Sequence, residues 1–178
     1  MRAVVAGGSG FLGSHLCEAL LRRGDSVCCL DDFSSGRAQN VGHLLRTPGF
    51  ECVSCDVTAR LRVVGEVDAV VHLASPASPY DYQRMPLQTL AAGSRGTENL
   101  LRLALRHQAR FVLASTSEVY GDPVVHPQTE DYWGNVNPVG PRSVYDEAKR
   151  YAEALSMAYR RSEEADVGIQ KLNSDGSS

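Results

Sequence analysis

Three evenly spaced glycines near the start of the sequence restrict its fold more than any other feature. Gly7, Gly10 and Gly13 follow a short apolar run at residues 4–6. Apolar residues then recur at helical spacing as far as Gly24, which predicts a strand, a tight turn and a helix closed by a glycine. In such a unit the first glycine allows the turn, the second lets a pyrophosphate approach the backbone, and the third lets the helix pack on the sheet.

An acidic residue at the end of the next apolar run favours a dinucleotide as the ligand of this turn. The run covers residues 26–30 and leads into Asp31 and Asp32, with Asp31 lying 18 residues after Gly13. A carboxylate at this position accepts hydrogen bonds from ribose hydroxyls and repels a 2′-phosphate, so it favours NAD over NADP. Arg37 could still accommodate that phosphate, and a glycine-rich turn without a ligand remains the other interpretation.

Apolar runs alternate with helical patterns along the rest of the sequence. We expect strands at residues 50–57, 69–73 and 111–114, long helices at 87–107 and 143–161, and a loop at 121–142. This alternation predicts an α/β fold, a Rossmann-type doubly wound parallel sheet covered on both faces. The last helix would have Ser143 as its N-cap. Its buried stripe would contain Val144, Ala148, Tyr151, Ala152, Leu155 and Ala158.

A tyrosine and a lysine four residues apart lie in the last predicted helix. Tyr145 and Lys149 would share one face, so the ammonium would favour the ionised phenol and lower its pKa. A phenolate at neutral pH can take a proton from a hydroxyl while hydride leaves the same carbon for NAD. The hydroxyls of residues 115–117 follow the strand at 111–114, at the sheet edge where ligands bind in such folds. A solvated helix face and a polar capping turn are the structural alternatives.

Charge and cysteine content narrow the class of protein. The net charge of −3 gives no basis for nucleic-acid binding, and no apolar run approaches the roughly 20 residues of a membrane helix. The first strand begins too early to leave room for a signal peptide, so we expect a cytoplasmic protein. The odd number of cysteines indicates reduced thiols, and Cys52 and Cys55 lack the partners of a zinc site, so we expect no metal.

Several longer stretches resemble one family of nucleotide-sugar enzymes. Residues 72–79, 114–123, 126–128, 132–134, 137–138, 140–142 and 145–150 are similar to the UDP-glucuronate decarboxylases, which are NAD-dependent epimerase/dehydratase relatives in the extended short-chain dehydrogenase/reductase superfamily. The resemblance covers most of residues 1–161 and implies decarboxylation of UDP-glucuronate to UDP-xylose through a 4-keto sugar. A 4-epimerase or a 4,6-dehydratase is the alternative, although Ser117 stands where the dehydratases carry an aspartate.

The resemblance also implies roles for single residues. Thr116 and Tyr145 would form the proton-handling pair, and Glu118 would be the acid or base near the sugar ring. Lys149 would orient the tyrosine and the nicotinamide ribose, whereas His72 would be structural. The expected cofactor-binding residues are Gly7, Gly10, Phe11, Leu12, Gly13, Asp31, Asp32, Phe33, Ser35, Gly36, Asp56, Val57, Leu73, Ser75, Tyr145 and Lys149.

Two stretches depart from the family pattern. Residues 91–93 replace a Lys-Thr-Asn-like stretch that helps to hold cofactor and substrate in the family, and Gly93 would weaken its helix by roughly 1 kcal/mol against alanine. Near Gly168 the sequence diverges, and we expect the second domain that grips the UDP-sugar in relatives to be missing. We therefore expect a NAD-binding domain at residues 1–161, followed at 162–178 by a truncated strand start and a disordered tail.

The expected truncation affects function and assembly. Without a closing domain, much of the substrate binding energy would be missing, so we expect this chain alone to be a weak or inactive decarboxylase of its UDP-sugar substrate. The helices at 87–107 and 143–161 could pair with a twin subunit to form a homodimer, as they do in relatives. A non-catalytic NAD-binding or dimerising fragment is the alternative from another functional class.

Overall fold

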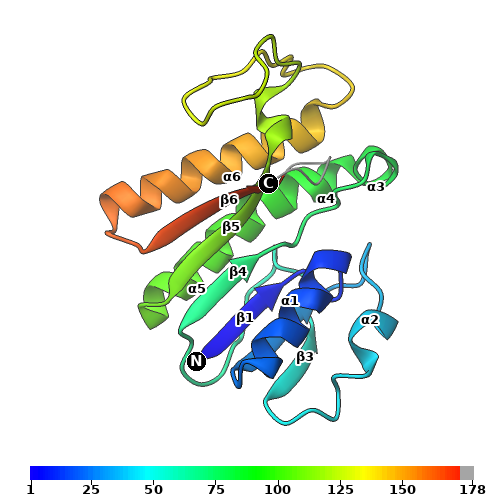
Figure 1. The fold of residues 1–178 in the computed structure, drawn as a ribbon, viewed down its shortest axis with the longest axis vertical. Coiled ribbons are helices and arrows are strands. Elements are labelled where there is room, and N and C mark those ends of the chain that lie inside the picture. The colour runs from blue at the N-terminus through cyan, green and yellow to red at the C-terminus, as the bar shows by residue number, and fades with distance from the viewer. Residues whose placement is uncertain (173–178) are drawn as a thin grey trace.

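Six parallel strands form one sheet in the order β3-β2-β1-β4-β5-β6. The computed structural model describes residues 1–172, so part of the predicted tail, residues 173–178, lies outside the described residues (Figure 1). β1 pairs with both β2 and β4, and the strand order reverses beside it, as predicted for a doubly wound sheet. The strands are β1 (Arg2–Ala6), β2 (Ser26–Asp31), β3 (Phe50–Ser54), β4 (Ala69–His72), β5 (Arg110–Thr116) and β6 (Val167–Leu172).

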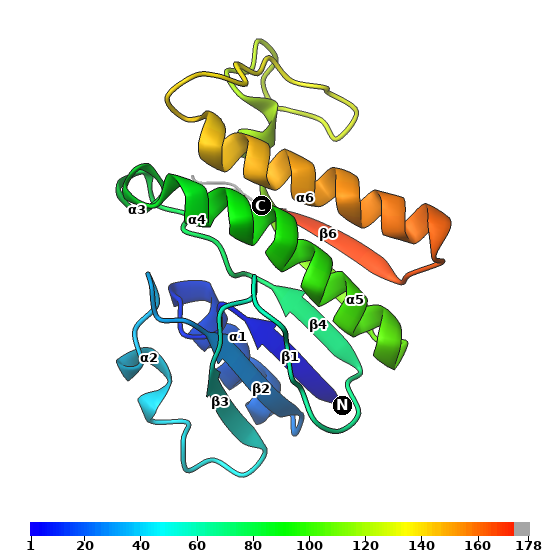
Figure 2. The same ribbon diagram turned by 180° about the vertical axis from the view of Figure 1, so that it is seen from behind.

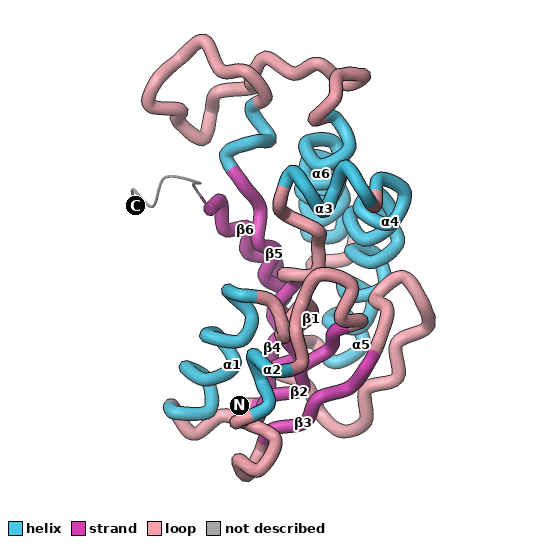
Figure 3. The backbone as a smooth tube through the Cα atoms, turned by 90° about the vertical axis from the view of Figure 1, so that its right-hand side faces the viewer, coloured by secondary structure: helices cyan, strands magenta, loops and turns pink. Residues whose placement is uncertain are grey.

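Helices cover both faces of the sheet. α1 lies on one face, and α5 and α6 lie side by side on the other (Figures 2 and 3). Within residues 1–172, none of the helices is long and apolar enough to cross a membrane. The helices are α1 (Phe11–Arg22), α2 (Gln39–Gly42), α3 (Pro79–Arg84), α4 (Pro86–Ala91), α5 (Thr97–His107) and α6 (Ser143–Ser162).

The two faces have separate apolar cores because side chains alternate along each strand. In β1, Ala3 and Val5 belong to the core with Cys17 of α1, while Val4 and Ala6 belong to the core on the other face. These four β1 side chains are fully buried, whereas Arg2 is half-buried. Burial on both faces explains why the strand sequences are almost continuously apolar, as parallel sheets require.

The ends of β3 and β5 differ from the sequence prediction. β3 ends at Ser54 rather than at residue 57, although the N–H of Cys55 still donates a hydrogen bond of 2.9 Å to the carbonyl oxygen of Asp31 in β2. β5 runs beyond residue 114 because it pairs with β6 from Phe111 to Thr116. The expected start of a sixth strand is thus a strand of six residues in the described structure.

The helix predicted at 87–107 consists of α4, a π-helical turn at Ala92–Gly96 and α5. Gly93 lies in the π-helical turn, where it is buried against α6. A Cβ atom at Gly93 would lie 2.7 Å from both the Cβ and the carbonyl oxygen of Ala148. The predicted helix cost of Gly93 leaves out this role, in which the missing side chain allows two helix backbones to approach.

The α6 predictions were wrong in two details. The helix begins at Ser143 with Arg142 as its N-cap, and no side chain caps it. Tyr151 of the expected stripe is 52% exposed, whereas Tyr145 and Lys149 are buried. An apolar pattern could not show this, because the buried face of α6 carries polar side chains. The described buried residues of α6 are Tyr145, Asp146, Ala148, Lys149, Ala152 and Ser156.

We predict that Gly93→Ala destabilises the protein although alanine is the better helix former. Because the obstacle includes the backbone of α6, we expect a loss of about 1–3 kcal/mol in the free energy of unfolding. Gly42→Ala is the matched control, since no atom lies within 4 Å of its added Cβ. Urea denaturation would measure both variants, and a stabilised Gly93→Ala would contradict the close packing.

Candidate cofactor and catalytic site

A buried carboxylate joins the glycine turn to the end of β2. Asp31 is 6% exposed, and its Oδ2 accepts a hydrogen bond of 2.8 Å from the backbone N–H of Ser9. Its Oδ1 accepts a bond of 2.9 Å from the N–H of Phe33. Burial raises the pKa of Asp31, although both hydrogen bonds favour the ionised form. The residue predicted to bind ribose therefore also fixes the shape of the turn.

The glycine turn has the close contacts that its spacing predicts. Gly7 has a φ of +80°, and an added Cβ would lie 2.7 Å from the backbone nitrogen of Ala74. A Cβ at Gly13 would overlap the carbonyl oxygen of Gly7. Since α1 begins directly after Gly10, its first N–H groups are available to an anion beside the turn.

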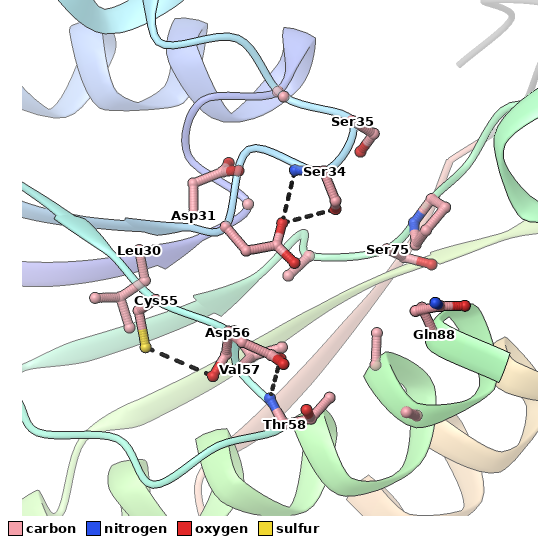
Figure 4. Close-up of a pocket in the computed structure, with 18 of the residues that line it drawn as sticks. Leu30, Asp31, Ser34, Ser35, Cys55, Asp56, Val57, Thr58, Ser75 and Gln88 are labelled. Atoms are coloured by element: carbon pink, nitrogen blue, oxygen red, sulfur yellow. Dashed lines mark hydrogen bonds between the residues drawn. The ribbon is translucent and has the colours of Figure 1, made fainter. Parts of the chain in front are cut away.

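A cavity of about 390 Å³ opens beside the turn (Figure 4). Ser75 lies in its wall, and within residues 1–172 the buried Oγ of Ser75 has no hydrogen-bond partner. A glycine cradle, a helix N-terminus and an unpaired hydroxyl fit a dinucleotide that carries phosphates and ribose hydroxyls. Ten predicted cofactor residues line this cavity: Gly7, Gly10, Asp31, Asp32, Ser35, Gly36, Asp56, Val57, Leu73 and Ser75.

The other six predicted cofactor residues do not line this cavity. Phe11 and Leu12 are 75% and 51% exposed at the start of α1. Gly13 packs beneath the turn, and Phe33 contributes its backbone N–H to Asp31. Tyr145 and Lys149 lie on α6 and belong to a second group of side chains.

One wall of the cavity was missed by sequence reasoning. It comes from α4 and the π-helical turn and consists of Leu87, Gln88, Ala91, Ala92 and Arg95. Positions 87, 91 and 95 are four residues apart and could have indicated a shared helix face. Within this segment the family pattern points only to residues 91–93 for the cofactor, as a departure, and gives Leu87, Gln88 and Arg95 no role.

The catalytic candidates meet at the carboxyl end of β5. Thr116 is the last residue of β5, and Tyr145 and Lys149 project from α6. A hydrogen bond with Thr116 favours the ionised form of the Tyr145 phenol. The Nζ of Lys149 donates a bond of 2.7 Å to the carbonyl oxygen of Ala114 and lies 5.8 Å from the centre of the Tyr145 ring. The YxxxK spacing therefore brings the expected groups together.

The predicted electrostatic effect of Lys149 on Tyr145 is wrong for this chain. Burial, followed by the nearby charge of Glu118, raises the pKa of Tyr145 to about 12. Burial also lowers the pKa of Lys149 to about 8. The ammonium donates its hydrogen bond to a backbone carbonyl rather than to the phenol, and it does not offset the effect of burial on Tyr145.

Two further contacts of this group were not predicted. Glu118 lies in the 3₁₀ turn at Ser117–Tyr120 and forms an ion pair with Arg142, just before α6. The ring of Tyr82 from α3 stacks on Tyr145 with the centroids 5.3 Å apart and the planes 10° apart. Tyr82 is 1% exposed, so the stack fixes one face of the Tyr145 ring.

His72 is buried at the end of β4 and Cys52 lies in β3, whereas Cys55 lies just beyond β3 in the wall of the cavity. His72 is 2% exposed, its Nε2 lies 3.1 Å from Thr97 Oγ1, and burial lowers its pKa to about 3. Cys52 Sγ lies 3.9 Å from Cys29 Sγ, whereas Cys55 Sγ contacts the carbonyl oxygen of Asp56. Burial raises the pKa of Cys52 to about 11, and burial also raises that of Cys55.

Comparison with known proteins gives a consistent result. The NAD dependent epimerase/dehydratase family matches residues 3–173. UDP-glucuronic acid decarboxylase 1 of Arabidopsis thaliana is 51% identical over 97% of this chain and 39% of its own length. UDP-glucuronic acid decarboxylase 1 of Danio rerio is 50% identical over 96% of this chain and 40% of its own length. The chain thus spans about two fifths of these two relatives.

Solved structures share the fold. A UDP-galactose 4-epimerase superposes with a TM-score of 0.79 at 32% identity, over 95% of this chain and 55% of that one. DesIV, a dTDP-glucose 4,6-dehydratase from Streptomyces venezuelae with NAD and TYD bound, superposes with a TM-score of 0.84 at 30% identity. The superposition with DesIV covers 96% of this chain and 55% of that one.

We predict that Lys149→Met stabilises the protein at neutral pH. Between pH 8 and 10.5 the folded state binds fewer protons than the unfolded state at Lys149, so the wild-type protein gains stability as the pH rises. The variant removes a buried cation, and we expect a gain of about 1–3 kcal/mol at pH 7 that shrinks towards pH 10. Urea denaturation at pH 7 and pH 9.5 measures both proteins. A less stable variant at pH 7 would mean that the bond to Ala114 outweighs the burial of charge.

Proposed function

Because this chain belongs to the NAD dependent epimerase/dehydratase family, we propose that it binds NAD and serves the decarboxylation of UDP-glucuronate to UDP-xylose. The proposal rests on the position of Thr116, Tyr145 and Lys149, which lie together at the carboxyl end of β5. The glycine turn follows β1, another strand of the same sheet. Identity of 51% to a UDP-glucuronic acid decarboxylase supports the choice of reaction.

The cofactor would lie along the cavity beside the glycine turn. The backbone at Gly7 and Gly10 and the first N–H groups of α1 would hold its diphosphate. The carboxylate of Asp31 has lone pairs beyond those used by Ser9 and Phe33, so it can also accept from a ribose hydroxyl. When bound, NAD would supply a hydride acceptor with a positively charged nicotinamide ring.

Tyr145 and Thr116 would move the proton of the sugar C4 hydroxyl. In the chain itself Tyr145 keeps its proton at neutral pH, so it needs a nearby positive charge to become a base. Lys149 holds its ammonium beside the phenol ring, and Tyr82 fixes the plane of that ring. These contacts set the orientation on which proton transfer depends.

Decarboxylation follows from the chemistry of the oxidised sugar. A ketone at C4 stands β to the carboxylate of UDP-glucuronate, and it accepts the electron pair left when carbon dioxide departs. A proton is then needed on the sugar ring, and we assign its delivery to Glu118. Because UDP-xylose carries a hydroxyl at C4, the hydride removed there would have to be returned, so that the whole reaction consumes no oxidant. The ion pair with Arg142 holds this carboxylate near the end of β5.

Two other functions remain as alternatives to the proposal. The fold shared with the solved relatives is compatible with a 4-epimerase or a 4,6-dehydratase. The dehydratase is less favoured, because this chain has Ser117 at the position where related dehydratases typically carry an aspartate. A non-catalytic NAD-binding protein is the alternative from another class. The products formed by the chain separate all three functions.

The function is tested by cofactor binding and by product analysis of the full chain. We expect NAD to raise the midpoint of thermal unfolding, since a ligand that binds only the folded state stabilises it, by about 2.7 kcal/mol at 100 times its Kd. With UDP-glucuronate and NAD, we expect UDP-xylose and carbon dioxide at well below ~1 turnover per second.

Tyr145→Phe is the matched variant, because phenylalanine keeps the stack on Tyr82 and removes only the hydroxyl. We expect it to retain NAD binding and to lose product formation by at least about 100-fold. NAD binding without any product would support the non-catalytic alternative. A 4-epimer or a 4-keto-6-deoxy sugar would support the other enzymes, and no effect of NAD would contradict the proposal entirely.

We also propose that two copies of the chain associate through the helices at 87–107 and 143–161. Leu90 on α4 is 39% exposed and Tyr151 on α6 is 52% exposed, which leaves apolar surface for a second copy to cover. Sedimentation velocity is expected to give about twice the 19.3 kDa mass of one chain. A monomer at all concentrations would exclude this dimer.

A further inference from the structure

Arg95 stands out in the cofactor cavity because its charge differs from that of its neighbours. The cavity is lined by three carboxylates, Asp31, Asp32 and Asp56, and in the described part of the chain Arg95 is the one lysine or arginine beside them. Its side chain is exposed, and within residues 1–172 it takes part in no ion pair. Arg95 is therefore free to meet a ligand.

The three carboxylates have other hydrogen-bond donors. Asp31 accepts from backbone N–H groups, Asp32 accepts from the N–H and hydroxyl of Ser34, and Oδ1 of Asp56 accepts a bond of 2.8 Å from the N–H of Thr58. Figure 4 shows the bonds of Ser34 and Thr58 on separate walls of the cavity. The three carboxylates thus accept hydrogen bonds without a guanidinium, and Arg95 is not required to hold an aspartate in place.

The neighbours of Arg95 define which end of the cavity it occupies. A Cβ at Gly96 would lie 2.8 Å from Val57 Cγ2, so the π-helical turn packs directly on the segment after β3. One helical turn further on, Asn99 Nδ2 donates bonds of 2.9 and 3.0 Å to the carbonyl oxygens of Val57 and Ala59. Arg95 therefore lies at the end of the cavity formed by residues 55–58.

A dinucleotide in this cavity would place its adenine base at that end. The diphosphate would lie at the glycine turn at the end of β1 and the ribose at Asp31 at the end of β2, so the base would come next, towards the end of β3. A guanidinium is planar, always charged and weakly hydrated, and it stacks on flat π systems better than an ammonium does. We infer that Arg95 stacks on the adenine base of the cofactor and closes that end of the cavity.

The inference rests on the proposed binding of NAD and is tested on the full chain with two probes. ADP-ribose carries the base and the diphosphate, whereas adenosine carries the base without phosphate. Isothermal titration would measure ADP-ribose, and ligand-observed NMR would measure adenosine. For Arg95→Ala we expect both dissociation constants to rise by the same factor, about 3- to 30-fold.

Two further variants serve as controls. Arg95→Lys keeps the charge but loses the plane, so we expect most of the loss to persist. Arg106→Ala removes an exposed arginine of α5 that does not line the cavity, and it should bind both probes as the wild type does. Equal unfolding temperatures without ligand would show that the Arg95 variants fold.

Each remaining outcome decides against the inference. Unchanged binding by Arg95→Ala overturns it directly. A loss confined to ADP-ribose would mean that Arg95 pairs with the diphosphate, and full recovery in Arg95→Lys would mean that charge alone matters. If the wild type binds neither probe, the proposed NAD site fails as well, which distinguishes that result from a failure of the stacking alone.

Discussion

The two hydrogen bonds accepted by Asp31 determine the shape of the rest of the cavity. One bond reaches back to the glycine turn at Ser9 and the other reaches forward to Phe33, so a single carboxylate joins the ends of β1 and β2. Both donors are backbone groups, which explains how a buried charge is tolerated without a cation. The same carboxylate faces the cavity, and structural and binding roles therefore share one side chain.

The catalytic candidates depend on a second constraint, which is the close approach of two helices. Gly93 lets α6 pack against the π-helical turn, and this contact buries the face of α6 that carries Tyr145 and Lys149. Burial shifts both groups towards their neutral forms. The pair is therefore placed by packing, but its burial favours the neutral phenol.

The sequence allowed the sheet, the glycine turn, Asp31 and the YxxxK pair to be predicted, because each depends on local spacing. Strand alternation and glycine contacts leave a direct pattern in the residues. The π-helical turn, the Tyr82 stack and the Glu118–Arg142 pair could not be predicted, since each joins residues through tertiary packing. The pKa of Tyr145 was mispredicted for the same reason: spacing shows that a lysine is near, but it does not show how much water both groups have lost.

The π-helical turn also interrupts the regular α-helical register between α4 and α5. It widens the turn between α4 and α5, so Gly93 can meet α6 while Arg95, two positions later, borders the cavity and Thr97 bonds to His72. Residues 93–97 therefore contact α6, the cavity and His72 on different sides of the helix. Because a π-helical turn holds one residue more than an α-helical turn, loss of one residue here would restore regular α-helix and leave the faces of α4 and α5 close to their present register. The extra residue therefore adds contacts within residues 92–96 without changing the face that α5 presents to the sheet.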